Sequence, residues 1–253
     1  MPGLITISIF FASLALFVGG YFLSSAFYYK RHDVKYSFKR MFPYEFNYPN
    51  SFKRNIYGNI ALVLSLVGII TLYIYKMSIS NSQTITIYVL VALSIITAAF
   101  IGCLLFMPLQ FLRTHMIVST LCMTCAFAMP ALNALMGYEA LKVAELDSSK
   151  ALSIVAIVIG VILALVMVIL LLNPRATYKI YLDKSVDKDG NEVMARPKFI
   201  PIAFNEWWAI FTYMLSPIPL IILNYQLFRL LSKIKKRRPN LPTERRNYAL
   251  CIE

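Results

Sequence analysis

Charge is scarce in this sequence, and negative charge is the scarcest. Only 15% of the 253 residues are charged, whereas a soluble domain holds about 25%. Hydrophobic residues make up 59% of the chain, and the mean hydropathy is +0.66. This balance excludes an ordinary soluble domain and predicts long apolar segments.

The charge that is present is mostly positive. Lys and Arg number 25 against 12 Asp and Glu, so the formal net charge is +13. A basic excess favours either nucleic acid or an anionic membrane surface. Because the basic residues crowd the hydrophilic segments of a membrane-like chain, we expect membrane lipids as partners, including anionic lipids such as phosphoinositides, and no nucleic acid.

Cysteine is also scarce, and the four residues present do not form a disulfide framework. Cys103, Cys122 and Cys125 lie inside apolar runs, and Cys251 lies near the end. Cys122 and Cys125 form a C-x-x-C pair, but no basic neighbour favours the thiolate that redox chemistry needs. We therefore expect these cysteines to pack in the interior.

No catalytic constellation is visible in the sequence. It offers no nucleophile–base pair, no metal-ligand cluster and no phosphate loop, so we expect neither cofactor, metal nor enzymatic activity. The deep apolar runs hold no ionisable residue, and such residues usually mark function inside a membrane. His115 and Glu206 lie at the ends of runs, where we expect an interfacial histidine and a helix-capping carboxylate.

Apolar runs long enough to cross a membrane are what the sequence has in abundance. A spanning helix needs about 20 predominantly apolar residues, and backbone hydrogen bonding in lipid favours helices. The sequence therefore predicts an all-α integral membrane protein, a six-helix bundle within residues 1–231. The predicted spans are 4–29, 56–75, 85–108, 115–138, 151–172 and 207–231. The first run lacks the basic segment of a signal peptide, and we expect it to be retained.

Small residues line one face of the fifth run. Ala156, Gly160 and Ala164 follow one another at four-residue spacing, which allows two helix backbones to approach closely. We expect a helix-packing seam within the bundle, or alternatively a dimer face.

Prolines and asparagines interrupt the fourth and sixth runs. Pro130 in the fourth and Pro217 with Pro219 in the sixth are expected to kink these helices. Asn133 and Asn224 are expected to hydrogen-bond between helices.

Two long hydrophilic segments separate the runs. The first, residues 30–55, is basic and contains an aromatic stretch at 41–49, which suits a segment lying against lipid headgroups. In the second, residues 173–206, side chains at 178–182 follow the alternating pattern of a β-strand, and Asp189-Gly190 offers a tight turn. We expect a small β-hairpin outside the bilayer between spans five and six.

A basic tail follows the last run, at residues 232–253. Its residues nearest the membrane are candidates for contact with anionic lipid, at about 1 kcal/mol per basic residue; the alternative is a plain stop-transfer anchor. These candidates are Lys233, Lys235, Lys236, Arg237 and Arg238.

The distribution of basic residues leaves the orientation open. With six spans, loops one, three and five carry 14 basic residues on one side, and the other loops with the tail carry 11 on the other. The first loop and the tail both have the composition of cytoplasmic segments, yet an even number of spans separates them.

Several short motifs, taken in their order and spacing, resemble those of the DRAM-type family, the damage-regulated autophagy modulators. They are Phe42-Pro43-Tyr44, Ile56-Tyr57-Gly58-Asn59, Gly102-Cys103, His115, Tyr138 and Glu206-Trp207. The chain departs from the family where Glu45-Phe46-Asn47 follows the first motif, and its first loop is more basic.

The resemblance implies a six-span membrane protein. Members of the family and their relatives act in autophagy modulation, in GPI-anchor remodelling and in tethering a phosphoinositide kinase. It also implies cytosolic termini, lumenal or extracellular first and fifth loops, and residence in an endomembrane (lysosome or Golgi) or the plasma membrane. Three alternatives remain open: an accessory subunit of a larger membrane complex, with membrane-protein partners; a small transporter or channel; and a catalytic lipid-remodelling protein.

Overall fold

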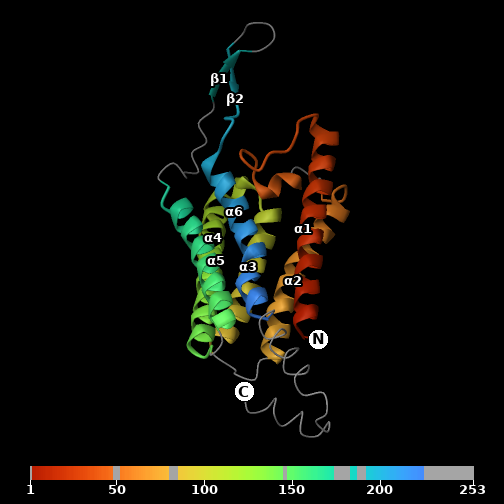
Figure 1. Cartoon of the computed structure of the whole chain (residues 1–253). Coiled ribbons are helices and arrows are strands. Elements are labelled where there is room, and N and C mark those ends of the chain that lie inside the picture. The colour runs from red at the N-terminus through yellow and green to blue at the C-terminus, as the bar shows by residue number, and fades with distance from the viewer. Residues whose placement is uncertain are drawn as a thin grey trace.

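The computed structural model is a bundle of long helices that run up and down in sequence order (Figure 1). It describes residues 2–47, 52–79, 85–144, 147–173, 183–186 and 192–224. The helices are α1 (Pro2–His32), α2 (Ile56–Ile79), α3 (Ile85–Phe106), α4 (Leu112–Lys142), α5 (Asp147–Leu171) and α6 (Pro201–Leu215). Two 3₁₀ turns, Pro43–Phe46 and Leu109–Phe111, precede α2 and α4.

In the described residues, six helices are long and apolar enough to cross a membrane, which confirms the predicted number of spans. The protein is thus an integral membrane protein. The sixth span runs from Pro201 to Asn224 and not from Trp207, because Pro201 supplies the fixed backbone angle of a first helical turn. The basic tail lies outside the described residues, as do its five lipid-contact candidates.

Because the helices alternate in direction, the segments after α1, α3 and α5 meet at one end of the bundle (Figure 1). We call this the loop end; it comprises residues 33–47, 52–55, 107–111 and 192–200. The start of α1 and the end of the sixth span lie at the opposite end.

A short antiparallel strand pair extends from the loop end (Figure 1). Strand β1 (Asp183–Val186) pairs with β2 (Glu192–Ala195), so that Asp183 faces Ala195 and Val186 faces Glu192. The predicted strand at 178–182 and the predicted turn at Asp189-Gly190 lie outside the described residues.

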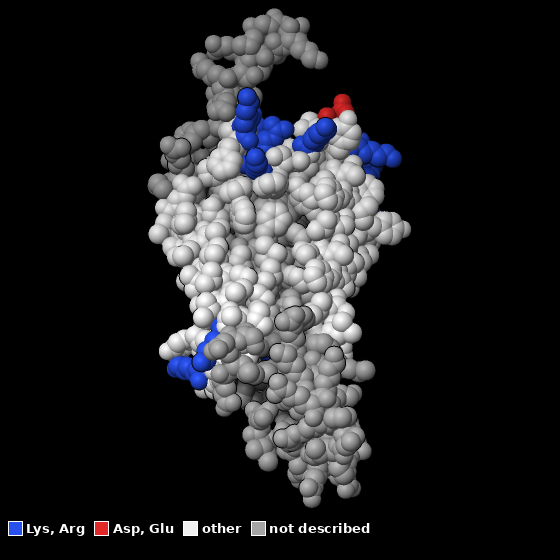
Figure 2. Space-filling model, viewed as in Figure 1, with Lys and Arg blue, Asp and Glu red and all other residues white. Residues whose placement is uncertain are grey.

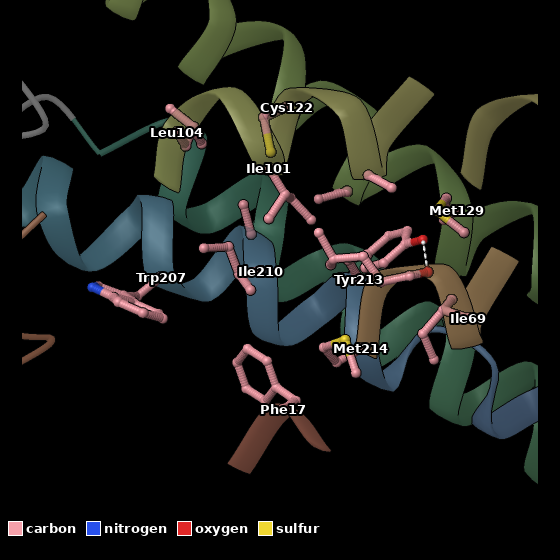
Figure 3. Close-up of a cluster of buried hydrophobic side chains, with 14 of the residues drawn as sticks. Phe17, Ile69, Ile101, Leu104, Cys122, Met129, Trp207, Ile210, Tyr213 and Met214 are labelled. Carbon is pink, nitrogen blue, oxygen red and sulfur yellow. Dashed lines mark hydrogen bonds between the residues drawn. The ribbon is translucent and has the colours of Figure 1, made fainter. Parts of the chain in front are cut away.

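Helix α6 is the centre of the bundle. In its most apolar stretch 61% of the residues are buried, against 22–39% in the other five spans. Figure 3 shows side chains of α6 surrounded by residues from α1, α2, α3 and α4, among them Phe17, Ile69, Ile101 and Cys122. Cys122 is buried and free, as expected of a packing cysteine, whereas Cys125 is only partly buried and Cys103 is exposed.

The sixth span is interrupted after Leu215, where Ser216 and Pro217 form a turn before the helix resumes. Proline was expected to kink this span, and the structure shows a break in the helix at Pro217. The Tyr73 and Ser216 hydroxyls lie 3.2 Å apart at the break, within hydrogen-bond distance.

Both asparagines predicted to join helices do so. Asn133 of α4 donates to the Tyr73 hydroxyl of α2 at 2.8 Å. Asn224 lies between two other spans, since its Nδ2 donates to Thr6 of α1 and its Oδ1 accepts from Lys76 of α2.

The predicted small-residue seam lies between α4 and α5, within the bundle. Ala156, Gly160 and Ala164 are buried. A Cβ atom added to Gly160 would lie 2.8 Å from the Pro130 carbonyl oxygen and 2.9 Å from the Ala134 Cβ. The absence of a side chain at Gly160 therefore sets how closely these two helices approach.

Candidate functional site

Six residues of the family-like motifs meet at the loop end, whereas Tyr138 lies exposed near the opposite end of α4 and Cys103 is exposed on α3. Phe42, Pro43 and Tyr44 come from the first loop, His115 from the start of α4, and Glu206 with Trp207 from α6. They are up to 165 positions apart in the chain, since the first is residue 42 and the last is residue 207. The folding of the first loop brings them together.

The first loop folds back into the bundle. Met41, Phe42, Tyr44, Glu45 and Phe46 are all buried. The prediction that this aromatic stretch lies against headgroups is therefore wrong for residues 41–46, because the protein's own helices cover these side chains.

A 3₁₀ turn places these loop side chains. Pro43 is its first residue, and the Glu45 carboxylate accepts a hydrogen bond of 2.8 Å from the Phe42 backbone N–H. The turn thus closes on itself and points Phe42 and Tyr44 toward α4, where both rings contact His115 edge-on at centroid distances of 6.1 Å and 5.8 Å.

His115 and Glu206 form a buried pair. Nε2 of His115 lies 2.9 Å from Oε1 of Glu206, and both side chains are completely buried. The predictions that His115 is interfacial and that Glu206 caps a helix are therefore wrong. Glu206 is the sixth residue of α6, beyond the first turn, and it faces the interior.

The hydrogen bond made by Nδ1 of His115 determines which atoms of the pair carry protons. Nδ1 lies 2.9 Å from the Met107 carbonyl oxygen. A carbonyl can only accept, so Nδ1 carries a hydrogen. One further proton then joins Nε2 to Oε1, whether it is bonded to the imidazole or to the carboxyl, and the pair as a whole is neutral. A neutral pair is the form that a buried acid and base tolerate.

Trp207 locks the first loop to α6. Its indole N–H is shared between the Met41 carbonyl and the Tyr36 hydroxyl, both at 3.0 Å. The Tyr36 hydroxyl in turn donates to the Phe42 carbonyl at 2.8 Å. Burial, with a smaller contribution from the Glu45 charge, raises the pKa of Tyr36 well above its usual value, so this hydroxyl remains a donor.

The segment before α6 is joined to the first loop by an ion pair and by the backbone. Arg196 donates two hydrogen bonds to the Glu45 carboxylate, at 2.7 and 2.8 Å. Burial acts to lower the pKa of Arg196, but the hydrogen bond and the charge of Glu45 outweigh it and raise the pKa. The Ile200 N–H also donates to the Lys39 carbonyl at 2.9 Å.

Gly58 belongs to a second polar group, at the start of α2. Asn59 donates to the Asn47 side chain at 2.8 Å, and Asn47 donates to the Leu105 carbonyl at 3.0 Å. A Cβ on Gly58 would lie 2.3 Å from the Ser24 hydroxyl and 2.5 Å from Oδ1 of Asn55. Glycine at this position therefore makes room for the asparagine cluster beside α1.

Sequence patterns missed several residues of the site. Glu45 and Asn47 stand out in the sequence only as a departure from the family motif, and no pattern singles out Arg196 or Tyr36. The Arg196–Glu45 pair spans 151 positions, and no local pattern signals such a partner. The alternating charge and aromatic residues of the first loop were the available signal for Glu45 and Tyr36.

The site is enclosed and lacks a metal-binding arrangement. Among the described residues there is no group of three or more His, Cys, Asp or Glu side chains that could hold a metal ion. The buried His115–Glu206 pair has acid–base groups, but aromatic rings cover it and separate it from the surface. Its geometry favours holding helices and loop together.

Comparison with models of known protein families, with curated proteins and with solved structures finds no match for this chain. Its function is therefore inferred from its own residues.

Proposed function

We propose that this protein is a non-enzymatic membrane protein of the DRAM type, which acts through lipid contacts or partner recruitment at the membrane surfaces. Its roles would be membrane-lipid organisation or autophagy modulation, in an endomembrane or the plasma membrane. The observation that supports this proposal is the meeting of Phe42, Tyr44, His115, Glu206 and Trp207 in one buried assembly.

The assembly supports a structural role for the motif residues. Both ring nitrogens of His115 and Oε1 of Glu206 are used on each other and on Met107, whereas Oε2 of Glu206 has no hydrogen-bond partner in the described part of the chain. A substrate would reach the pair only by displacing buried aromatic rings. A scaffold needs such a rigid connection between its first loop and its central helix. A catalytic pair would need access for the reacting group.

Figure 2 supports action at the membrane surfaces. Lys and Arg side chains gather at the loop end, and a smaller group lies at the opposite end. Between these groups the visible face carries neither basic nor acidic side chains in its described part, as a lipid-facing surface requires.

In the proposed orientation both termini are cytosolic and the loop end is lumenal or extracellular. The tail, with Lys233, Lys235, Lys236, Arg237 and Arg238, then follows the sixth span into the cytosol, where anionic lipids attract it. This arrangement also assigns 14 basic residues to the non-cytosolic side, against the usual bias.

One observation favours a second candidate, an accessory subunit of a larger complex. Helix α5 is the least covered span, with 22% of its most apolar stretch buried. Ile162, Leu165 and Ile169 are each more than half exposed there. In a complex this face would pack against another membrane protein; in a lone protein it faces lipid.

The deciding experiment is the accessibility of a C-terminal tag in sealed vesicles, with an N-terminal tag as the matched control. We expect a protease on the cytosolic side to remove both tags. A C-terminal tag that is protected in the lumen would overturn the proposed topology and the contact of the tail with cytosolic lipid.

Two further measurements separate the candidates. Replacing Lys235, Lys236, Arg237 and Arg238 by Glu should release a partner or change localisation, whereas an unchanged distribution would indicate a plain anchor. The mass of the detergent-solubilised particle tests the subunit hypothesis, since a lone monomer would contradict it.

A further inference from the structure

A basic cavity opens at the loop end, separate from the enclosed His115–Glu206 pair. It has a volume of about 410 Å³, within the range of cavities that hold small molecules. Aromatic and amide side chains and four basic ones line it: Phe27, Tyr28, Phe46, Asn55, Lys30, Arg31, His32 and Arg54.

The cavity lining is positive. Lys30, Arg31 and Arg54 carry permanent charges, His32 adds a titratable ring, and no Asp or Glu is among the described residues that line the cavity. All four basic residues are exposed, so a ligand can reach them. Lys and Arg offer several N–H donors and no acceptor, which is the chemistry that recognises phosphate oxygens.

The basic residues at the end of α1 have a simpler explanation, which accounts for only part of the cavity. Lys30, Arg31 and His32 occupy the last turn of α1 and complement the negative end of its dipole. That explanation does not extend to Arg54, which directly precedes α2 and approaches the same cavity from a second helix. Two helix ends thus converge on one volume.

The wall of the cavity is packed against the bundle by hydrogen bonds and ring contacts. Asn55 is buried, and its amide donates toward the side chains of Asn47 and Asn59. Phe46 is buried against Tyr36, Tyr21 and Trp207. The cavity is therefore built on the packed loop end rather than on an isolated loop.

The position of the cavity along α1 places it at the level of lipid headgroups. Helix α1 has 31 residues and is about 46 Å long, whereas the hydrocarbon core is about 30 Å thick. Its last turn therefore extends beyond the acyl chains. Along α1, Phe27 and Tyr28 come before Lys30, Arg31 and His32, which form its last turn. The cavity thus offers both aromatic and basic side chains, as suits a ligand that is part apolar and part anionic.

We propose that this cavity binds a phosphate-bearing headgroup, with Lys30, Arg31 and Arg54 as donors to the phosphate. The volume exceeds what phosphate alone needs and leaves room for the group esterified to it. This site is distinct from the basic tail, because the cavity lies where α1 ends and the sixth span, after which the tail follows, ends on the opposite side of the bundle. The proposal does not depend on the proposed function or orientation.

The test measures retention of radiolabelled phosphatidic acid by the purified full-length protein in phosphatidylcholine–detergent micelles. The double variant Lys30→Gln/Arg54→Gln removes two charges from the cavity. The matched control Lys35→Gln/Lys53→Gln removes two exposed charges from the same loop end that do not line the cavity. Gel filtration of each variant checks that the bundle remains folded.

We expect the cavity variant to weaken retention roughly tenfold, which is about 1.4 kcal/mol, and the control variant to retain the lipid as the unmodified protein does. Equal losses in both variants would assign the effect to general surface charge and overturn the proposal. Absence of retention by the unmodified protein would also overturn it.

Competition identifies the source of the phosphate group. Unlabelled phosphatidic acid displacing the label, with glycerol 3-phosphate without effect at the same concentration, supports a membrane lipid as the ligand. Displacement by both supports a soluble phosphate ester, and displacement by diacylglycerol, which lacks the phosphate, would overturn the proposal. A lumenal C-terminal tag would overturn the proposed orientation and leave these outcomes unchanged.

Discussion

The loop end and the α4–α5 seam hold the same bundle together by different means. At the loop end, polar groups from distant segments pair with one another: His115 with Glu206, and Glu45 with Arg196. At the seam there is no side chain at Gly160 at all, and helix backbones touch. In lipid there is no hydrophobic driving force for helix association, so close packing and interhelical hydrogen bonds stabilise the bundle instead.

The difference predicts how each region fails. A polar pair fails when one partner is removed, because the remaining group is buried without a partner. A close-packed seam fails when an atom is added, because the backbones must separate. Substitutions of these two kinds therefore test the comparison.

The largest effect is expected for Glu206→Leu, which leaves His115 buried beside an apolar side chain. We expect a loss of about 3 kcal/mol in the free energy of unfolding. Unfolding in mixed micelles of increasing denaturing detergent, followed by labelling of the buried thiol of Cys122, measures it.

The double variant His115→Leu/Glu206→Leu is the control for this prediction. It removes both members of the pair, so we expect part of the stability to return, since apolar replacements need no partner. A double variant as unstable as Glu206→Leu would contradict the role assigned to the unpaired histidine.

At the seam, Gly160→Ala is expected to cost about 1 to 3 kcal/mol. The new Cβ would meet the Pro130 carbonyl oxygen, a backbone atom that cannot move without α4. Gly19→Ala is the matched control, because a Cβ there has nothing within 4 Å. The same unfolding assay should show a neutral or slightly stabilising effect for Gly19→Ala; similar losses in both would refute close packing as the cause.

A smaller effect is expected for Trp207→Phe, which keeps an aromatic ring and removes the indole N–H. The loss of its shared hydrogen bond to Met41 and Tyr36 should cost about 1 kcal/mol. Trp208→Phe is the control, because in the described part of the chain the Trp208 N–H has no hydrogen-bond partner. In detergent, Trp207→Phe should therefore unfold at a lower temperature than Trp208→Phe. Equal midpoints would argue against a stabilising hydrogen bond from the Trp207 indole.

The smallest effect is expected for Arg196→Gln. The Arg196 side chain is 34% exposed, and partly exposed ion pairs contribute up to about 1 kcal/mol. Lys198→Gln removes an exposed charge two residues away and serves as the control. We expect the difference between the two variants to shrink as salt is raised, because salt screens the pair; a difference of several kcal/mol would show that the loop end depends on this contact far more than its exposure suggests.

Much of the bundle followed from local patterns. The six apolar runs predicted six spans, the four-residue spacing of Ala156, Gly160 and Ala164 predicted a seam, and Asn133 and Asn224 were expected to join helices. These features depend on hydropathy and helical periodicity, which are properties of short stretches of chain.

The candidate site was predictable only as a set of motifs. His115 and Glu206 were expected at separate, water-accessible positions, and the aromatic stretch of the first loop at the headgroups. All three expectations failed for one reason, since the loop folds inward and covers the pair. Inward folding depends on the 3₁₀ turn at Pro43 and on Trp207, which lies 164 positions further along the chain.

By itself, the sequence determined that the chain enters a membrane, how many times it crosses, and which faces of its helices are small or apolar. These outcomes follow from transfer of side chains into lipid and from the helical repeat. The tertiary structure alone decided that His115 hydrogen-bonds to Glu206, that Arg196 forms an ion pair with Glu45, and that Arg54 and Lys30 line one cavity. Each of these contacts joins separate segments of the chain, and only the packing of helices and loop determines which polar groups become neighbours.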